Sequence, residues 1–415
     1  MLVIEGRVFL DGELKNAAIG IKDGKIAEVK KVIKGDKNMD LGDRIILPGF
    51  VDPHVHFRDP GMTHKEDFIS GSLSALYGGT TCVLDMPNTK PPVVNSNTLN
   101  DKKRIIKGRS FVDYGLFASL TAKCDPAALA PKVCGFKLFM GSTTGDILMN
   151  DDNAIQRMMY AVAPTGKRVS VHAEDNSLLK DMEEKSNRDH LRARPVAAEH
   201  NAINRLSRYK GMKVNICHIT DPVSVATASS LGFTTEITMH HLFLHDMMSD
   251  SATIKVNPPL RDVNTRDALY RTFAEGKITM FGTDHAPHTT DEKNRSYDEA
   301  PPGIPGTEVY VPMMMDMVKK GKLPLELIVR MGATAPADAF GMNKGKIEVG
   351  RDADFAIFDM RNSRTIKAKH LHGKAGYTPY EGWDAVFPDM VMVRGEIQLK
   401  NGELCGEMIG DDLYE

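Results

Sequence analysis

The middle of the chain alternates between short apolar runs and longer mixed segments that have room for a helix. The runs lie near residues 50–57, 80–86, 111–120, 133–140, 168–174, 213–220, 233–241 and 277–283. Strands separated by helix-length crossovers indicate a parallel sheet with helices outside. Eight such runs predict an α/β fold of the closed (β/α)8 type, the TIM barrel. An open doubly wound sheet is the alternative, but no G-x-G-x-x-G follows the first run, which disfavours a dinucleotide-binding version.

Both ends of the chain have a different pattern. Near the N-terminus apolar and polar positions alternate, and two Asp-Gly pairs indicate hairpin turns. Residues 350–359 and 389–398 repeat this pattern near the C-terminus. We therefore predict a small β domain formed by both chain termini. The predicted boundaries are residues 1–48 and 346–415 for the β domain and residues 49–345 for the barrel.

Composition and charge exclude several classes of function. The 415 residues include 53 Lys and Arg against 55 Asp and Glu, a net charge of −2, so no basic surface for nucleic acid or an anionic membrane is indicated. No apolar run approaches the ~18 residues of a membrane span, and the first residues lack the pattern of a signal peptide. The five cysteines are scattered, without a C-x-x-C pair. We expect a cytoplasmic protein that acts on a small molecule, and we leave homo-oligomerisation open.

The strongest chemical signal is His54-Val55-His56, at the end of the first predicted strand. Side chains two apart on a strand face the same way, so both imidazoles point to one side, where they suit a divalent metal. Two buried histidines satisfied by hydrogen bonds are the alternative. Similar residue types recur at later strand ends, namely Lys137, His172, His218 and Asp284. Any one of them has a structural explanation, but six on five strand ends indicate one site at the C-terminal face of the barrel.

Lys137 is unusual because it lies inside an apolar run. A buried ammonium is costly and needs a partner or another charge state. A lysine that reaches past the barrel rim into solvent is one interpretation. The other is reaction of the neutral amine with carbon dioxide to give a carbamate, an anion that can bridge two metals. Burial favours the neutral amine that this reaction requires.

These residues resemble the binuclear pattern of the amidohydrolase superfamily, and the resemblance covers nearly the whole chain. It rests on residues 49–61 (GFVDPHVHFRDPG), 85–89 (DMPNT), 135–139 (GFKLF), 171–175 (VHAED), 217–218 and 282–288 (GTDHAPH). The resemblance implies two zinc ions bridged by carboxylated Lys137 and a hydroxide. The implied ligands of one zinc are His54, His56, Lys137 and Asp284, and those of the other are Lys137, His172 and His218. It also implies that Asp284 transfers the proton during hydrolysis of a cyclic amide.

Within the superfamily the segments are similar to the dihydroorotase family, whose members interconvert N-carbamoyl-L-aspartate and L-dihydroorotate in pyrimidine synthesis. Arg58 follows His56 by two residues, and on one strand face it lies near the metals. Together with Asn88 it can hold a substrate carboxylate by charge-assisted hydrogen bonds. The resemblance further implies substrate contacts by Asn257 and His288. The alternatives are ordinary roles in a turn, a rim ion pair or a loop.

Two other functions are open at this stage. A hydantoinase, dihydropyrimidinase or allantoinase has the same metals, but a neutral ring has no use for a carboxylate clamp. A non-catalytic barrel is disfavoured because all six ligand-type residues are present. Cys217 and Glu236 correspond to ligands of a third zinc in some dihydroorotases. Adjacent strand residues face opposite ways, however, so we expect Cys217 to pack behind the site.

Overall fold

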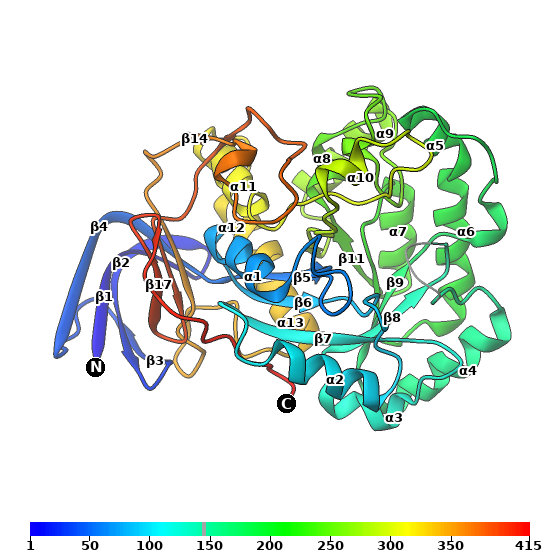
Figure 1. Cartoon of the computed structure of the whole chain (residues 1–415). Coiled ribbons are helices and arrows are strands. Elements are labelled where there is room, and N and C mark those ends of the chain that lie inside the picture. Colours follow the sequence, from blue (N-terminus) through cyan, green and yellow to red (C-terminus); the bar gives the residue numbers. More distant parts are fainter. Residues whose placement is uncertain (143–146) are drawn as a thin grey trace.

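A parallel eight-stranded sheet surrounded by helices forms the larger part of the molecule (Figure 1). The computed structural model describes residues 1–142 and 147–415. The strands, neighbours in space as in sequence, are β5 (Phe50–Val55), β6 (Thr80–Asp85), β7 (Asp113–Ser119), β8 (Gly135–Phe139), β9 (Arg168–His172), β10 (Val214–Ile216), β11 (Thr234–Ile237) and β12 (Met280–Phe281). A parallel bridge between Val55 and His285 joins β5 to the segment after β12. Each predicted run contains one strand, so the (β/α)8 prediction is confirmed.

Helices fill the crossovers between these strands and cover the sheet (Figure 1). They are α1 (Phe68–Tyr77), α2 (Ser96–Ile106), α3 (Pro126–Leu129), α4 (Asp152–Val162), α5 (Asn187–Ala193), α6 (Val196–Leu206), α7 (Pro222–Ser230), α8 (Met239–Phe243), α9 (Val263–Ala274), α10 (Thr290–Lys293), α11 (Tyr310–Lys319), α12 (Leu325–Val329) and α13 (Ala335–Phe340). Polar N-caps fix several starts; Asp67, for example, accepts a hydrogen bond from the backbone N–H of Ser70 at the start of α1. No helix in the described part of the chain is long and apolar enough to cross a membrane.

The barrel strands are buried on both faces, which explains their continuous apolar runs. Phe136, Val171 and Ile216, from three neighbouring strands, belong to one apolar core that continues under the surrounding helices. The polar residues of the predicted site lie at the carboxyl ends of the strands, as with His54, Lys137 and His172, or in the loops that follow them. The fold therefore brings distant segments of the sequence to one face of the barrel.

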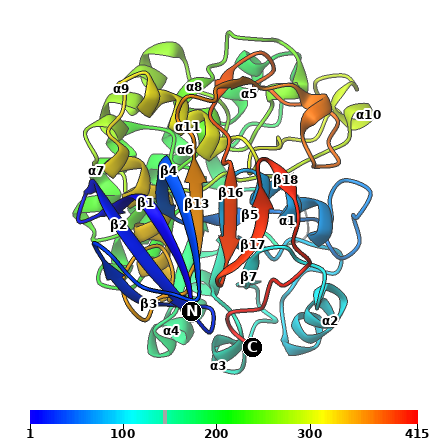
Figure 2. The same cartoon turned by 90° about the vertical axis from the view of Figure 1, so that its left-hand side faces the viewer.

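The second sheet is built from both ends of the chain, whose strands lie side by side in Figure 2. Its order is β18 (Glu403–Leu404), β17 (Glu396–Lys400), β16 (Met390–Val393), β13 (Phe355–Phe358), β4 (Lys37–Pro48), β1 (Leu2–Leu10), β2 (Glu13–Lys22) and β3 (Lys25–Lys30). Asp23 and Gly24 join β2 to β3 with φ of 51° and 74°, as a type I′ hairpin turn requires. The prediction of a β domain shared by the termini is confirmed, whereas its residue boundaries stay a prediction. A further small sheet pairs β14 (Arg364–Thr365) with β15 (Asp384–Ala385).

Candidate active site

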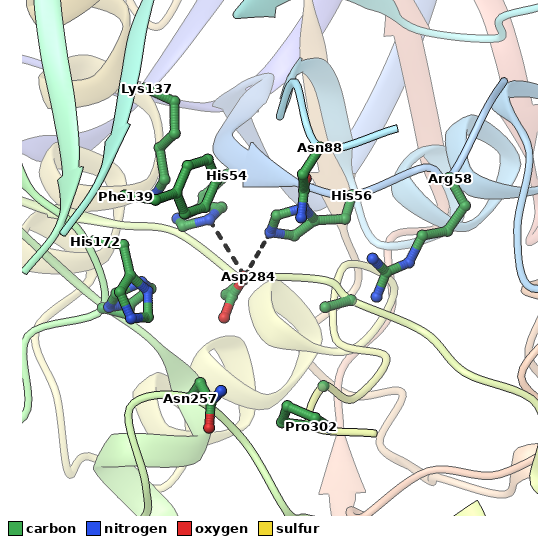
Figure 3. Close-up of a pocket in the computed structure, with 13 residues that line it drawn as sticks. His54, His56, Arg58, Asn88, Lys137, Phe139, His172, Asn257, Asp284 and Pro302 are labelled. Atoms are coloured by element: carbon green, nitrogen blue, oxygen red, sulfur yellow. Dashed lines mark hydrogen bonds and ion pairs between the residues drawn. The ribbon is translucent and has the colours of Figure 1, made fainter. Parts of the chain in front are cut away.

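His54 and His56 converge on the carboxylate of Asp284 at the carboxyl end of the barrel (Figure 3). Their Nε2 atoms lie 3.2 and 2.9 Å from the same oxygen, Oδ1, of Asp284. The three side chains are buried, and each offers a ligand atom within 4.8 Å of the others. Asp284 follows β12 with φ of 47°, a left-handed turn that directs its carboxylate toward the opening strand.

His172 and His218 form a second pair beside the first. Nδ1 of His172 and Nε2 of His218 are 2.9 Å apart, and the His54 and His218 rings have centroids separated by 5.5 Å. Lys137 is fully buried, with its Nζ 3.0 Å from the Sγ of Cys217. All six predicted metal-site residues line one pocket in the described part of the chain.

Three of the four histidines are oriented by a hydrogen-bonded side chain on the ring nitrogen that faces away from the shared centre. Nδ1 of His54 contacts Glu236 at 2.6 Å, and Nδ1 of His56 contacts the Oδ1 of Asn88 at 2.6 Å. Nε2 of His172 contacts Glu174 at 2.8 Å. In each ring this leaves the other nitrogen directed at the shared centre. Carboxylate and carbonyl partners of this kind fix the tautomer and increase the basicity of metal-binding imidazoles.

The electrostatics of the centre favour a bound cation. Burial and Lys137 lower the pKa of His54, but the carboxylates of Glu236 and Asp284 outweigh them and raise it to about 10. Burial opposes ionisation of Asp284, yet His54 and His56 hold its pKa well below the usual value. The buried Nδ1 of His218 has no hydrogen-bond partner among the described residues. Imidazole nitrogens, a carboxylate and an unpaired nitrogen form a donor set that suits zinc or a similar divalent metal.

Replacing Glu174 with glutamine tests the orienting role of that carboxylate. Glu174 also accepts hydrogen bonds from the buried guanidinium of Arg194, and these interactions hold its pKa low despite burial. We expect metal affinity to fall about 10–100-fold, and the free energy of unfolding to fall by about 3–5 kcal/mol because Arg194 loses its buried anion. Metal titration and denaturant unfolding measure the two effects. Glu199→Gln, at a buried carboxylate beside Arg261, is the control; equal loss of metal affinity in both variants would contradict the assignment.

Cys217 does not line the pocket, whereas His218 does. The Sγ of Cys217 lies 3.0 Å from Nζ of Lys137, and Cys217 groups within 4.8 Å with His54 and with Glu236, the partner of Nδ1 of His54. Cys217 therefore lies behind the residues that line the pocket, as expected from the sequence.

Arg58 and Asn88 lie on the other side of the pocket, with Asn257 across from them (Figure 3). Strand alternation was the wrong reason for placing Arg58, because β5 ends at Val55 and Arg58 has a φ of 62° in the following loop. Its guanidinium is nevertheless buried in the pocket wall. Burial lowers the pKa of Arg58 to about 10, so it is a cation at neutral pH.

His288 lies behind Arg58, outside the residues that line the pocket. Lys65 can only donate, so its contact of 3.0 Å makes Nδ1 of His288 an acceptor. Nε2 then carries the hydrogen and donates to the carbonyl of Pro302 at 3.0 Å. The guanidinium of Arg58 lies 3.2 Å from the same Nε2, so two hydrogen-bond donors are neighbours at this position. Burial and the neighbouring cations lower the pKa of His288 and keep it neutral.

Sequence reasoning missed several residues that shape this pocket. Glu174 and His190 orient pocket side chains, and Lys293 donates to the carbonyls of Pro301 and Gly303 beside the substrate side. Glu174 was visible only as part of the segment around His172. His190 and Lys293 lie in short helices with no motif, so no signal in a single sequence could have identified them.

This fold and this site define the amidohydrolase class of metal-dependent hydrolases. The model of the amidohydrolase family matches residues 45–398. The L-hydantoinase (dihydropyrimidinase) of Arthrobacter aurescens has a similar structure, with a TM-score of 0.91 and 26% identity over 99% of this chain and 98% of that chain. A D-hydantoinase from a Thermus species shares the fold, with a TM-score of 0.91 at 24% identity over 100% and 99% of the two chains.

Relatives by sequence define the family more narrowly. The dihydroorotase of Thermoplasma acidophilum is 37% identical over 98% of this chain and 96% of its own length. The dihydroorotase of Pyrococcus furiosus is 36% identical over 100% of this chain and 96% of its own length. The chain belongs to the dihydroorotase family within the amidohydrolases. The prediction of an enzyme that hydrolyses a cyclic amide is confirmed at this level.

Proposed function

We propose that this chain interconverts N-carbamoyl-L-aspartate and L-dihydroorotate, and that Arg58 recognises the carboxylate that both compounds carry. The observation that carries this proposal is the buried cation of Arg58 in the lining of the pocket. A guanidinium can donate two parallel charge-assisted hydrogen bonds to a carboxylate. The names of the curated relatives support the same reaction.

The amides of Asn88 and Asn257 complete the polar side of the pocket. The Oδ1 of Asn88 contacts Nδ1 of His56, so its Nδ2 is left to donate. Nitrogen donors from Arg58, Asn88 and Asn257 match a substrate whose exposed groups are carboxylate and carbonyl oxygens. We assign these three residues, with His288 beside Arg58, to substrate binding.

The metal set is also a proposal. His54, His56, Lys137 and Asp284 would hold one zinc, and Lys137, His172 and His218 a second, with Lys137 carboxylated. Lys137 suits the modification because no carboxylate of the described residues pairs with its buried nitrogen, whose near contact is the Sγ of Cys217. When bound, such metals supply Lewis acidity and lower the pKa of water toward neutrality.

Asp284 is the residue that moves the proton. Its Oδ1 lies between His54 and His56, and its carboxylate points into the pocket toward Asn257 (Figure 3). In ring opening, the oxygen of water adds to the ring carbonyl carbon, the carbon–nitrogen bond breaks, and Asp284 carries a proton from water to the departing nitrogen. In ring closure the same steps run backwards from protonated Asp284. Asp284 gives its proton to the substrate carboxylate, then takes the proton from the carbamoyl nitrogen as that nitrogen bonds to the carboxyl carbon, and this second proton leaves with one carboxylate oxygen as water.

Replacing Arg58 with alanine distinguishes this reaction from that of a hydantoinase. We expect kcat/KM for ring opening of L-dihydroorotate to fall about 10²–10³-fold, because the substrate carboxylate loses a buried charge-assisted bond of ~3–4 kcal/mol. Ring opening of dihydrouracil, which has no carboxylate, should change little. Steady-state assays of both rings give the measurement.

Arg109→Ala is the control, since Arg109 is a partly exposed arginine that pairs with Asp59 outside the pocket. If wild type opens both rings equally well and Arg58→Ala leaves that ratio unchanged, the substrate assignment is wrong.

A further inference from the structure

A buried hydrogen-bonded chain stands behind Asn257, on the pocket wall opposite the metal-type ligands. His190, from α5, is 3% exposed, and its Nε2 lies 2.8 Å from the Oδ1 of Asn257 and 3.0 Å from the carbonyl oxygen of Val256. Its Nδ1 lies 2.8 Å from the carboxylate of Glu184, which also pairs with Lys255 at 3.2 Å. Asn257 lines the pocket, whereas His190, Glu184 and Lys255 do not.

The chemistry of these contacts fixes the orientation of the Asn257 amide. A backbone carbonyl can only accept, so the contact with Val256 requires a hydrogen on Nε2 of His190. Because Nε2–H is a donor, the atom of the Asn257 amide that contacts it must be the oxygen, which is an acceptor. The amide nitrogen of Asn257 therefore points away from His190. Figure 3 shows this nitrogen on the side of Asn257 that faces Asp284.

Glu184 holds the His190 ring in this state. A carboxylate can only accept, so its contact with Nδ1 requires a hydrogen there, and both ring nitrogens donate. Burial alone would raise the pKa of Glu184, but the hydrogen bonds and charges of His190 and Lys255 lower it, so the carboxylate stays ionised. The ring cannot rotate to present a lone pair without breaking its bonds to Glu184 and Val256.

We propose that His190 is a positioning residue that locks Asn257 with its amide nitrogen toward the pocket, and so selects ligands that present an acceptor oxygen there. The inference rests on the proposed function for the identity of the substrate, whose ring carbonyl oxygen is the acceptor expected at this wall. An unlocked amide would present its oxygen about as readily as its nitrogen, and an oxygen facing a carbonyl repels it. An Asn side chain can either donate or accept a hydrogen bond, and His190 restricts Asn257 to donating on the side that faces the pocket.

A double-mutant cycle of His190→Ala and Asn257→Ala tests the proposal. We expect His190→Ala to raise KM for L-dihydroorotate about tenfold, the equivalent of one hydrogen bond, with kcat within about twofold. In the Asn257→Ala background the same replacement should leave KM within about twofold, because His190 acts through Asn257. His190→Gln, whose side-chain amide can donate the same bond, should recover most of the lost affinity.

Two further variants keep the result interpretable. His200→Ala removes a part-exposed imidazole that bonds Asp221 outside the pocket, and it should leave KM unchanged. If His190→Ala fails to fold, His190→Phe keeps a ring beside Tyr297, 6.3 Å away between centroids, but has no donor, and it takes the place of the alanine variant.

Three outcomes would overturn the proposal. The first is a lowered melting temperature with unchanged KM, which indicates a purely structural role. The second is an equal rise in KM with and without Asn257. The third is a crystal structure of the His190 variant in which the Asn257 amide keeps its orientation, a readout that does not depend on activity. Failure of the wild type to open dihydroorotate would instead refute the proposed function, and the cycle would then be run on the ring that it does open.

Discussion

Asn in place of Asp284 is expected to lower kcat/KM by about 10²–10⁴-fold in both directions of the reaction. The two side chains have the same shape, but an amide cannot accept and return a proton. Asp284 is also a proposed metal ligand, so bound metal must be measured in the same preparation by elemental analysis. A variant that keeps its metal and loses its activity assigns the loss to proton transfer. One that keeps metal and activity contradicts the role of Asp284.

The pH dependence gives a second test of Asp284. Burial opposes its ionisation, but His54 and His56 depress its pKa, so the carboxylate form is kept as pH falls until that lowered value is reached. Ring opening needs the ionised form and should decline as pH falls through this pKa. Ring closure needs the protonated form and should decline as pH rises through it. The same trend in both directions would refute the assignment, and Asp267→Asn, at a side chain that is 50% exposed, serves as the control.

The barrel and the grouping of its ligands could be predicted because they depend on local patterns. Parallel strands separated by helices place their carboxyl ends on one face, so residues at strand ends, such as His54, His172 and Asp284, meet whatever the details of packing. The same reasoning failed at Arg58. This residue comes after the end of β5, and a backbone turn with positive φ, not strand alternation, sets the direction of its side chain.

The residues that orient the site could not be predicted, for a different physical reason. Glu236 reaches His54 across 182 positions of sequence, and His190 reaches Asn257 across 67, so both contacts depend on how helices and loops pack. A buried glutamate or histidine has many possible partners in a sequence and only one in the folded chain. Hydrogen-bond partners of ligands are therefore the part of a site that a single sequence specifies least.

Methionine in place of Lys137 should abolish activity while leaving the fold intact. Methionine matches the length and apolar stem of lysine but cannot form a carbamate. Loss of the bridging anion should remove bound metal and lower kcat/KM on the order of 10³-fold or more, since several kcal/mol of charge stabilisation depend on it. Lys137 is fully buried without a carboxylate partner among the described residues, so its removal should not lower the free energy of unfolding.

Lys102→Met is the matched control for Lys137→Met, and the two should have opposite effects. Lys102 is also buried, but it pairs with the buried carboxylate of Asp85, so its removal should cost about 3–5 kcal/mol of unfolding free energy and leave the metal in place. Elemental analysis, denaturant unfolding and native mass measurement with and without bicarbonate distinguish the two lysines. Full metal content and activity in Lys137→Met would exclude a carboxylated lysine. A buried amine that stabilises nothing in the fold is instead expected where its modified form serves the chemistry.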